Sequence, residues 1–274
     1  MANEIVKYGP ELNTIPLKGF TSVEMNLFFS IVSRMRDKGN QMVRFPFSQL
    51  KDLSDYKATA NNRFIDDVEQ TYNKLMSLRF GRRSQTGLTR EFFVMFTDFK
   101  INGEAKEPYV DVRIHEKALP LLNDLDTWVR YSLMEFRDIR STYAKTVFRL
   151  LKQFRTTGYL YLSKEDFIEA LEVPKSYRQT HIDKRIIDPV MKELSPIFRN
   201  LKFTKKHGSG RGRPVVGYQF TFTKEAKNAD DFEIKKVNSP EREVDWRKVV
   251  VPESDQEEHR KVGTLLQEID QQDF

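Results

Sequence analysis

Side chains that can hydrogen-bond to the edges of DNA bases are concentrated in residues 175–185. Arg and Lys have the donors that suit guanine, and Gln suits adenine, when bases are approached through the major groove. Ser and Tyr hydroxyls suit phosphate oxygens instead. A solvated helix face would use similar residues, but the basic hairpin that follows favours DNA contact. The candidates are Lys175, Ser176, Tyr177, Arg178, Gln179, His181, Lys184 and Arg185.

The apolar residues within 176–195 predict the helix that would carry those side chains. They fall in one broad stripe when successive residues are placed about 100° apart. The stripe consists of Ile182, Ile186, Ile187, Val190, Met191 and Leu194. We therefore expect a helix over residues 176–195, with a buried face and a basic outer face. Because proline removes a backbone hydrogen bond, the helix should either bend at Pro189 or consist of two pieces.

A basic hairpin is predicted after this helix. Residues 201–205 have a strand pattern, and aromatic residues alternate with polar ones in a second strand over 216–223. A basic helix followed by such a hairpin is the plan of a winged helix, in which the helix enters the major groove. The turn would contact phosphates, or its RGRP sequence would enter the minor groove as in AT-hooks. Its basic residues are Lys205, Lys206, His207, Arg211 and Arg213.

The first half of the chain has the same order of predicted elements. A core helix is expected over residues 21–36, with Thr21 and Glu24 as a capping box. A strand over 43–47, a short helix capped by Ser48, a long helix over 61–78 and a hairpin follow. The second half repeats this order with a helix over 140–154, a strand over 159–162 and a short helix capped by Ser163. The pattern indicates an internal repeat.

A second group of candidate DNA-contacting residues lies in the first half. The long helix predicted there begins with Asn and Arg, which suit adenine and guanine, and basic residues recur in the hairpin after it. The alternative for an Asn at a helix start is a capping role. The candidates are Lys57, Thr59, Asn61, Asn62, Arg63, Arg82 and Arg83, with Arg90 beside them.

The charge is divided unevenly along the chain. Of the 274 residues, 229–274 contain 13 acidic and 7 basic residues, a net charge of −6. Residues 1–228 contain 39 basic and 27 acidic residues, a net charge of +12. A basic body indicates a polyanionic partner, although many basic surfaces only confer solubility. The acidic end, with few aromatic residues, predicts a mostly disordered tail.

Composition excludes several classes of protein. No apolar run is long enough for a membrane span, and the first residues lack the apolar region of a signal peptide. The absence of Cys fits a reducing cytoplasm. The four His residues are far apart, there is no GxxxxGK[ST] sequence, and no catalytic residue, metal ligand or cofactor site is expected.

Several of the stretches described above resemble the iteron-binding plasmid replication initiators, the Rep proteins with two winged-helix domains. The resemblance covers about residues 5–225 and is carried by STYAKTVFRLLKQF (141–154), YLYLSKEDFIEALEVPKSY (159–177), KRIIDPVMKELS (184–195) and, in the first half, NNRFIDDVEQTYNKLMSLRFG. It implies binding to direct repeats at an origin, melting of an adjacent A·T-rich segment, and recruitment of a host initiator and helicase. Dimers of such proteins often repress their own gene, while monomers initiate.

We therefore expect an α+β chain of tandem winged-helix domains related by internal duplication. Residues 1–125 would form the first domain, which contacts the DNA backbone and dimerises, and 126–228 the second, which contacts the repeats most specifically. Residues 229–274 would form the tail. The expected partners are double-stranded DNA, a second copy of the chain and the host proteins, in the bacterial cytoplasm. The alternatives are a transcriptional repressor of the same fold or a DNA-nicking enzyme.

Overall fold

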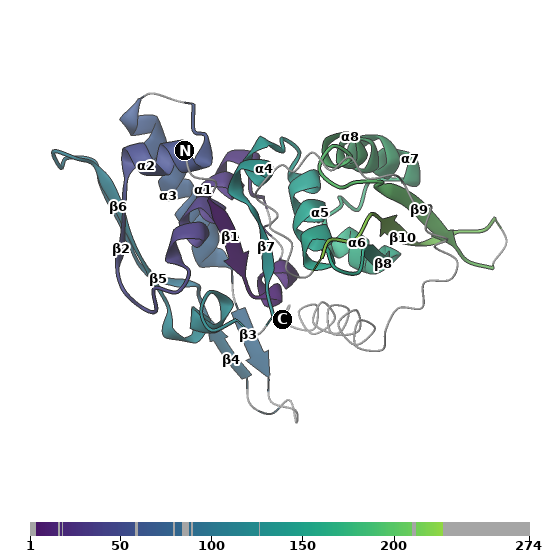
Figure 1. The fold of residues 1–274 in the computed structure, drawn as a ribbon, viewed down its shortest axis with the longest axis horizontal. Helices are drawn as coiled ribbons and strands as arrows, with labels where there is room; N and C mark the ends of the chain where they lie inside the picture. The colour runs from purple at the N-terminus through teal and green to yellow at the C-terminus, as the bar shows by residue number, and fades with distance from the viewer. Residues whose placement is uncertain are drawn as a thin grey trace.

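The computed structural model describes residues 4–226, apart from residues 16, 18, 58, 59, 79, 84–87, 89, 126, 210 and 211. The expected tail, residues 229–274, lies outside this range. Figure 1 shows the first half of the chain on the left and the second half on the right, with β1, β7 and α5 between them. Within the described residues, no helix combines the length and the apolar character that crossing a bilayer requires.

The first half contains three helices and a three-stranded antiparallel sheet. The helices are α1 (Ser22–Met35), α2 (Phe47–Ser54) and α3 (Asn61–Ser77). The sheet has the strand order β2-β6-β5 and is formed by β2 (Val43–Pro46), β5 (Phe96–Asn102) and β6 (Tyr109–Ile114). A separate hairpin of β3 (Phe80–Arg83) and β4 (Arg90–Phe93) projects from this half (Figure 1).

The second half has the same arrangement. Its helices are α5 (Thr142–Gln153), α6 (Lys164–Ala170), α7 (Gln179–Ile182), the π turn η3 (Asp183–Ile187) and α8 (Asp188–Leu194). Its sheet has the order β8-β10-β9 and is formed by β8 (Tyr159–Ser163), β9 (Lys202–His207) and β10 (Val215–Thr221). In both sheets the strand after the first helix pairs with the last strand, so the two units share one topology. Their origin by duplication stays a prediction.

Several elements differ from the sequence expectations. The helix α2 begins at Phe47 with Pro46 as its N-cap, so Ser48 is not the cap. The strand pattern after the first hairpin turn is divided into β4 and β5, and the hairpin of the first sheet is β5–β6. The expected caps by Thr21 and Ser163 are confirmed, because the Glu24 and Asp166 amides donate to their hydroxyls at 3.2 and 3.0 Å.

A small sheet and two short 3-10 helices connect the halves. The sheet pairs β1 (Ile5–Tyr8) with β7 (Val129–Ser132) and is not among the elements expected from the sequence. The 3-10 helices are η1 (Pro10–Thr14) and η2 (Glu116–Leu121), and the short helix α4 (Leu133–Asp138) follows β7.

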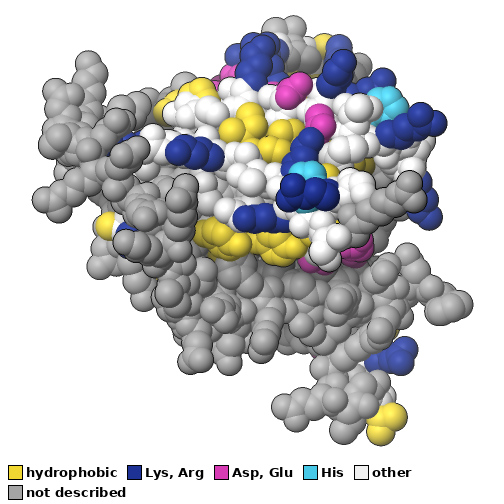
Figure 2. All heavy atoms as spheres, turned by 90° about the vertical axis from the view of Figure 1, so that its right-hand side faces the viewer, with side chains coloured by type: hydrophobic (Ala, Val, Ile, Leu, Met, Phe, Trp, Pro, Cys, Tyr) yellow, Lys and Arg dark blue, Asp and Glu magenta, His cyan; other side chains and the backbone are white. Residues whose placement is uncertain are grey.

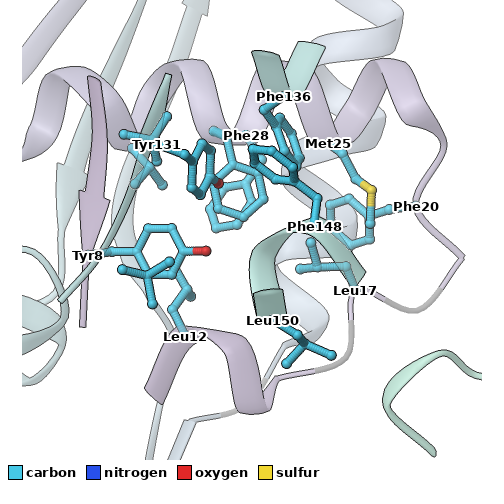
Figure 3. Close-up of a cluster of buried hydrophobic side chains, with 14 of the residues drawn as sticks. Tyr8, Leu12, Leu17, Phe20, Met25, Phe28, Tyr131, Phe136, Phe148 and Leu150 are labelled. Carbon is cyan, nitrogen blue, oxygen red and sulfur yellow. The ribbon is translucent and has the colours of Figure 1, made fainter. Parts of the chain in front are cut away.

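One aromatic cluster joins these elements into a continuous core. Tyr131 packs edge-on against Phe148 of α5, with ring centroids 5.1 Å apart, and the ring of Phe29 lies 4.9 Å from that of Phe136. Tyr8 of β1 lies 6.0 Å from Tyr131. Figure 3 shows Tyr8, Tyr131, Phe136 and Phe148 converging from β1, β7, α4 and α5. Tyr131 of β7 therefore links the first strand to the first helix of the second unit.

Four basic side chains of α5 and of the residues just after it are also buried. Lys145 donates from Nζ to Asn26 Oδ1 at 2.7 Å and to the Phe136 carbonyl at 2.5 Å. Lys152 and Arg155 both lie near the carboxylate of Glu225, at 3.4 and 3.3 Å. The fourth is Arg149. Buried ammonium and guanidinium groups need such partners, because an unpaired buried charge is strongly unfavourable.

Candidate nucleic-acid interface

The recognition helix, residues 179–194, has the two faces that its sequence predicts. Ile182, Ile186, Ile187, Val190 and Leu194 are buried, and Met191 is half-buried. Lys184 and Arg185 are exposed. The helix begins at Gln179 rather than at residue 176, because the Arg178 amide donates to His181 Nδ1 at 3.2 Å while its backbone is extended. Lys175, Ser176 and Tyr177 therefore lie in the turn that enters the helix.

A π turn precedes Pro189 within this helix. The Asp188 amide donates to the Asp183 carbonyl, five residues earlier, instead of four. Proline has no amide hydrogen for the carbonyl four residues before it, and a wider turn accommodates that loss. The helical residues run without interruption from Gln179 to Leu194, so the division into two pieces that Pro189 suggested does not occur.

Three of the candidate side chains form a cluster at the start of the helix. Arg185 donates from Nη1 to the Tyr177 hydroxyl at 3.3 Å, and its guanidinium lies 5.3 Å from the centre of the Tyr177 ring. The His181 ring packs edge-on against Tyr177, with centroids 5.6 Å apart. The hydrogen bond that Arg185 donates to Tyr177 raises the pKa of Arg185, which keeps this exposed side chain charged. These contacts with Tyr177 hold Arg185, a candidate for base contact, at an exposed position.

The hairpin β9–β10, called the wing, lies beside the recognition helix. Lys205 is half-buried and donates to Asp183 Oδ2 at 2.6 Å, whereas the next residue, Lys206, is exposed. At the turn, His207 Nδ1 lies 2.8 Å from the Arg213 carbonyl. Gly212 has a φ of +79°, a conformation that glycine adopts without strain. Arg213 is exposed, and Arg211 lies outside the described residues.

The candidates of the second half divide into paired and unpaired groups. Gln179 accepts from the Tyr218 hydroxyl and donates to Asp183, each at 3.0 Å, so it already has partners within the protein. Burial raises the pKa of Tyr218, which keeps its hydroxyl protonated as the donor. Figure 2 shows Lys and Arg side chains spread over the face that carries α7, α8 and the wing. Within the described part of the chain, these exposed basic side chains form no ion pair: Lys175, Arg178, Lys184, Lys206 and Arg213.

The first-half candidates near the start of α3 are exposed, but two of them contact neighbouring side chains. Asn61 is the first helical residue, after Ala60 as the N-cap, and its Oδ1 accepts from Lys51 Nζ at 2.8 Å. Lys57 donates to Asp55 at 2.6 Å. Asn62 and Arg63 are exposed, and Thr59 lies outside the described residues. The capping role considered for these Asn residues is not observed.

The remaining first-half candidates do not lie near the start of α3. Arg82 and Arg83 lie on β3, directly after the other end of α3. A helix of 17 residues is about 25 Å long, so the two groups lie at opposite ends of α3. The described residues contain no cluster of His, Cys, Asp or Glu suited to a metal ion.

Sequence reasoning did not select two residues that organise the interface. Asp183 and Tyr218 both bond to Gln179 and connect the recognition helix to β9 and β10. A spacing of four residues between Gln179 and Asp183 on one helix is the only signal of this in the sequence. The bonds to the wing depend on tertiary packing.

Two units of three helices and a three-stranded sheet, the second with an exposed basic helix and wing, define a tandem winged-helix DNA-binding protein. A family model described as "Initiator Replication protein, WH1" matches residues 5–152, and one described as "Initiator Rep protein, WH2" matches residues 163–222. The chain belongs to this family of initiator replication proteins. The first match extends through β7 and α4 into α5, and the boundary expected at residues 125 and 126 stays a prediction.

Known proteins agree with this assignment. The "Probable replication protein rep" of Bifidobacterium longum (strain NCC 2705) is 29% identical over 253 residues, which cover 91% of this chain and 82% of that protein. The crystal structure of the Pi initiator protein in complex with iteron DNA matches with a TM-score of 0.64 and 11% sequence identity. This match covers 82% of the present chain and 99% of the Pi chain, and at that identity it shows a shared fold.

Proposed function

We propose that this chain initiates plasmid replication by binding direct repeats, or iterons, at an origin. The observation that carries the proposal is the recognition helix beside its wing, with exposed Arg178, Lys184 and Arg185 at one end of the helix. The Pi initiator, which shares the fold, was solved with iteron DNA. Helices of winged-helix proteins enter the major groove, where Arg and Lys can donate to guanine.

In this proposal the wing contributes affinity more than sequence specificity. Lys206 and Arg213 are exposed on the hairpin and carry no ion pair within the described residues. Side chains so placed can neutralise phosphates, which raises affinity for any sequence and makes binding depend on salt. Lys205 is half-buried against Asp183, and its DNA contact would be secondary.

The second winged helix is proposed as the more specific of the two domains. Its face carries more unpaired basic side chains than the start of α3, where Lys51 and Lys57 are bonded to Asn61 and Asp55. The first domain, residues 1–125 in the expected division, would add contacts to the DNA backbone and form the dimer. Opening of DNA, recruitment of the host initiator and helicase, and repression of its own gene complete the proposal, on the basis of family resemblance.

We further propose that the protein acts without catalysis of its own, in the bacterial cytoplasm. The absence of Cys supports a reducing compartment. A metal-dependent nicking assay on supercoiled DNA tests the first point, and nicking that is lost on mutation of a single Tyr would overturn it.

The experiment for repeat binding is a footprint of the full chain on the DNA upstream of its own gene. Binding to the protected DNA and to random duplex is measured over a range of salt concentrations. Protection of several direct repeats, with a steep salt dependence, is expected. Protection of one inverted repeat would favour a repressor, and equal affinity for random DNA would contradict sequence-specific binding.

A further inference from the structure

Asp183 places a carboxylate among the basic side chains of the recognition helix and the wing. The side chain is 33% exposed, and it lies at the boundary of α7 and η3, directly before Lys184. A negative charge at this place repels DNA phosphates and lowers affinity for every sequence. A partly exposed ion pair also adds little to stability. Neither affinity nor stability therefore accounts for an acidic side chain here.

Both oxygens of this carboxylate are occupied by side chains of the protein. Oδ2 accepts from Lys205 of β9 at 2.6 Å, and Oδ1 accepts from Gln179 at 3.0 Å. Gln179 in turn accepts from the Tyr218 hydroxyl of β10 at 3.0 Å. The first turn of the recognition helix is thus bonded to both strands of the wing.

The main chain of the same residue holds the π turn. The Asp183 carbonyl accepts from the Asp188 amide, which closes the five-residue turn that contains Lys184 and Arg185. One residue therefore fixes two geometries: the turn that presents the basic side chains, and the place of that turn relative to the wing.

We propose that Asp183 is a positioning residue that sets the angle between the recognition helix and the wing, and so sets the specificity for DNA sequence. The inference rests on the proposed function, since it concerns the binding of that same face to DNA. Base contacts depend on the helix lying at one orientation in the groove, whereas phosphate contacts tolerate variation. Loss of the bond between Asp183 and Lys205 should therefore reduce discrimination between DNA sequences more than it reduces overall affinity.

The test compares two duplexes: one selected by the wild-type full chain from a randomised library, and one of random sequence and equal length. Specificity is the ratio of the two dissociation constants. Asp183→Asn and Lys205→Met should each lower this ratio by about tenfold, and the double variant should lower it no further, because both remove one bond. Lys205→Arg, which keeps the charge and the reach, should retain the wild-type ratio.

Lys206→Met is the matched control, because Lys206 is the exposed neighbour of Lys205 on the same strand. It should weaken binding to both duplexes equally and leave the ratio unchanged. Its effect on affinity should multiply with that of Asp183→Asn. Circular dichroism and thermal unfolding establish that each variant is folded.

Amide hydrogen exchange without DNA provides the second measurement. Asp183→Asn and Lys205→Met should accelerate exchange in residues 179–187 and 202–207, and Lys206→Met should not. Unchanged exchange in both variants would overturn the proposal. A change of preference at a single base pair in Asp183→Asn, with none in Lys205→Met, would also overturn it and assign Asp183 a direct base contact. If the wild type selects no sequence, the proposed function fails, and exchange alone decides whether Asp183 holds the helix on the wing.

Discussion

Arg149 donates from Nη2 to the carbonyl oxygen of Leu12 at 2.8 Å, across 137 residues of sequence. Its Nε also donates to the Tyr8 hydroxyl at 3.2 Å. Asn13 extends the contact by donating to Gln153 Oε1 at 2.9 Å. The start of the chain is thus bonded to the first helix of the second winged-helix unit. Arg149 and Leu12 are both buried.

Replacing Arg149 with Met should lower the free energy of unfolding by about 1–3 kcal/mol, because the Leu12 carbonyl would lose its buried donor. Urea unfolding measures the effect. Arg113→Met is the control, since Arg113 is 46% exposed and pairs with Asp98 at 3.4 Å. That variant should change stability by less than about 1 kcal/mol. Equal effects of the two substitutions would contradict a special role for the buried contact.

Lys145 should make stability rise with pH above neutrality. Burial lowers the pKa of this lysine to about 7 in the folded protein, although the charges of Glu193 and Asp138 oppose the shift. Between pH 7 and the ordinary lysine pKa near 10.5, the unfolded chain holds a proton that the folded chain has released. Unfolding then takes up a proton, so raising the pH stabilises the folded state. Below pH 7 the cost of the buried ammonium is present in full.

The measurement is urea unfolding of the wild type and of Lys145→Met at several pH values from 6.5 to 9.5, as approximate test points spanning the titration. The substitution also removes the hydrogen bonds to Asn26 and Phe136, so the slopes of stability against pH are compared rather than the absolute stabilities. The expected result is a smaller rise of stability with pH in the variant. Identical slopes in the two proteins would show that Lys145 remains charged in the folded state.

Gly158→Ala should be strongly destabilising. Gly158 has a φ of +70°, and a Cβ at this position would lie 2.5 Å from the Phe222 carbonyl oxygen. Strain and steric overlap together should cost about 2–4 kcal/mol. Gly39→Ala is the control: its φ is +58° with no atom within 4 Å of the added Cβ, and it should cost about 1 kcal/mol. Thermal unfolding measures both variants. An equal loss of stability in the two would show that the contact with Phe222 relaxes.

Arg178→Ala and Arg185→Ala should each weaken binding to the selected repeat by about 1–3 kcal/mol and relax base preference at one position. Binding to a set of single-base variants of the repeat measures this. Lys100→Ala removes one charge from the exposed side of β5 and should leave base preference unchanged. Wild-type preference in both arginine variants would mean that the recognition helix has been assigned incorrectly.

Arg213→Ala should weaken binding to all sequences and reduce the salt dependence. Loss of one phosphate contact should lower the slope of log affinity against log salt concentration by about 0.9. Lys38→Ala, at an exposed position after α1, should leave the slope as it is. An altered base preference in Arg213→Ala would instead indicate that the wing contacts the minor groove.

Local signals predicted much of the fold. The capping box of Thr21 and Glu24 and the cap by Ser163 are both present, since they depend on residues within one turn. The apolar stripe of the recognition helix is also buried as expected. The sequence predicts its start at residue 176, three residues before the observed start at Gln179. The turn before it, in which the Tyr177 amide donates to the Pro174 carbonyl at 2.8 Å, has no strong sequence signal.

Contacts between distant segments were not predictable in this way. β1 and β7 have four residues each and are far apart in sequence, so neither has a pattern that identifies its partner. Residue type alone does not show that Lys145 and Arg149 of α5 are buried, because their partners lie on other segments. At the interface, residue types indicated which side chains suit DNA. They did not indicate that Asp183 would bond Lys205 and Gln179, because that depends on how the wing packs.

The π turn ahead of Pro189 has an evolutionary consequence. It holds one more residue than an α-helical turn, which is equivalent to a single-codon insertion inside the recognition helix. Deletion of that codon would rotate the preceding side chains by about 100° relative to the buried face of α8. A related gene of different length at this point would therefore present other side chains on the exposed face of the helix. Such a change in length can alter the exposed face of this helix without any substitution along it.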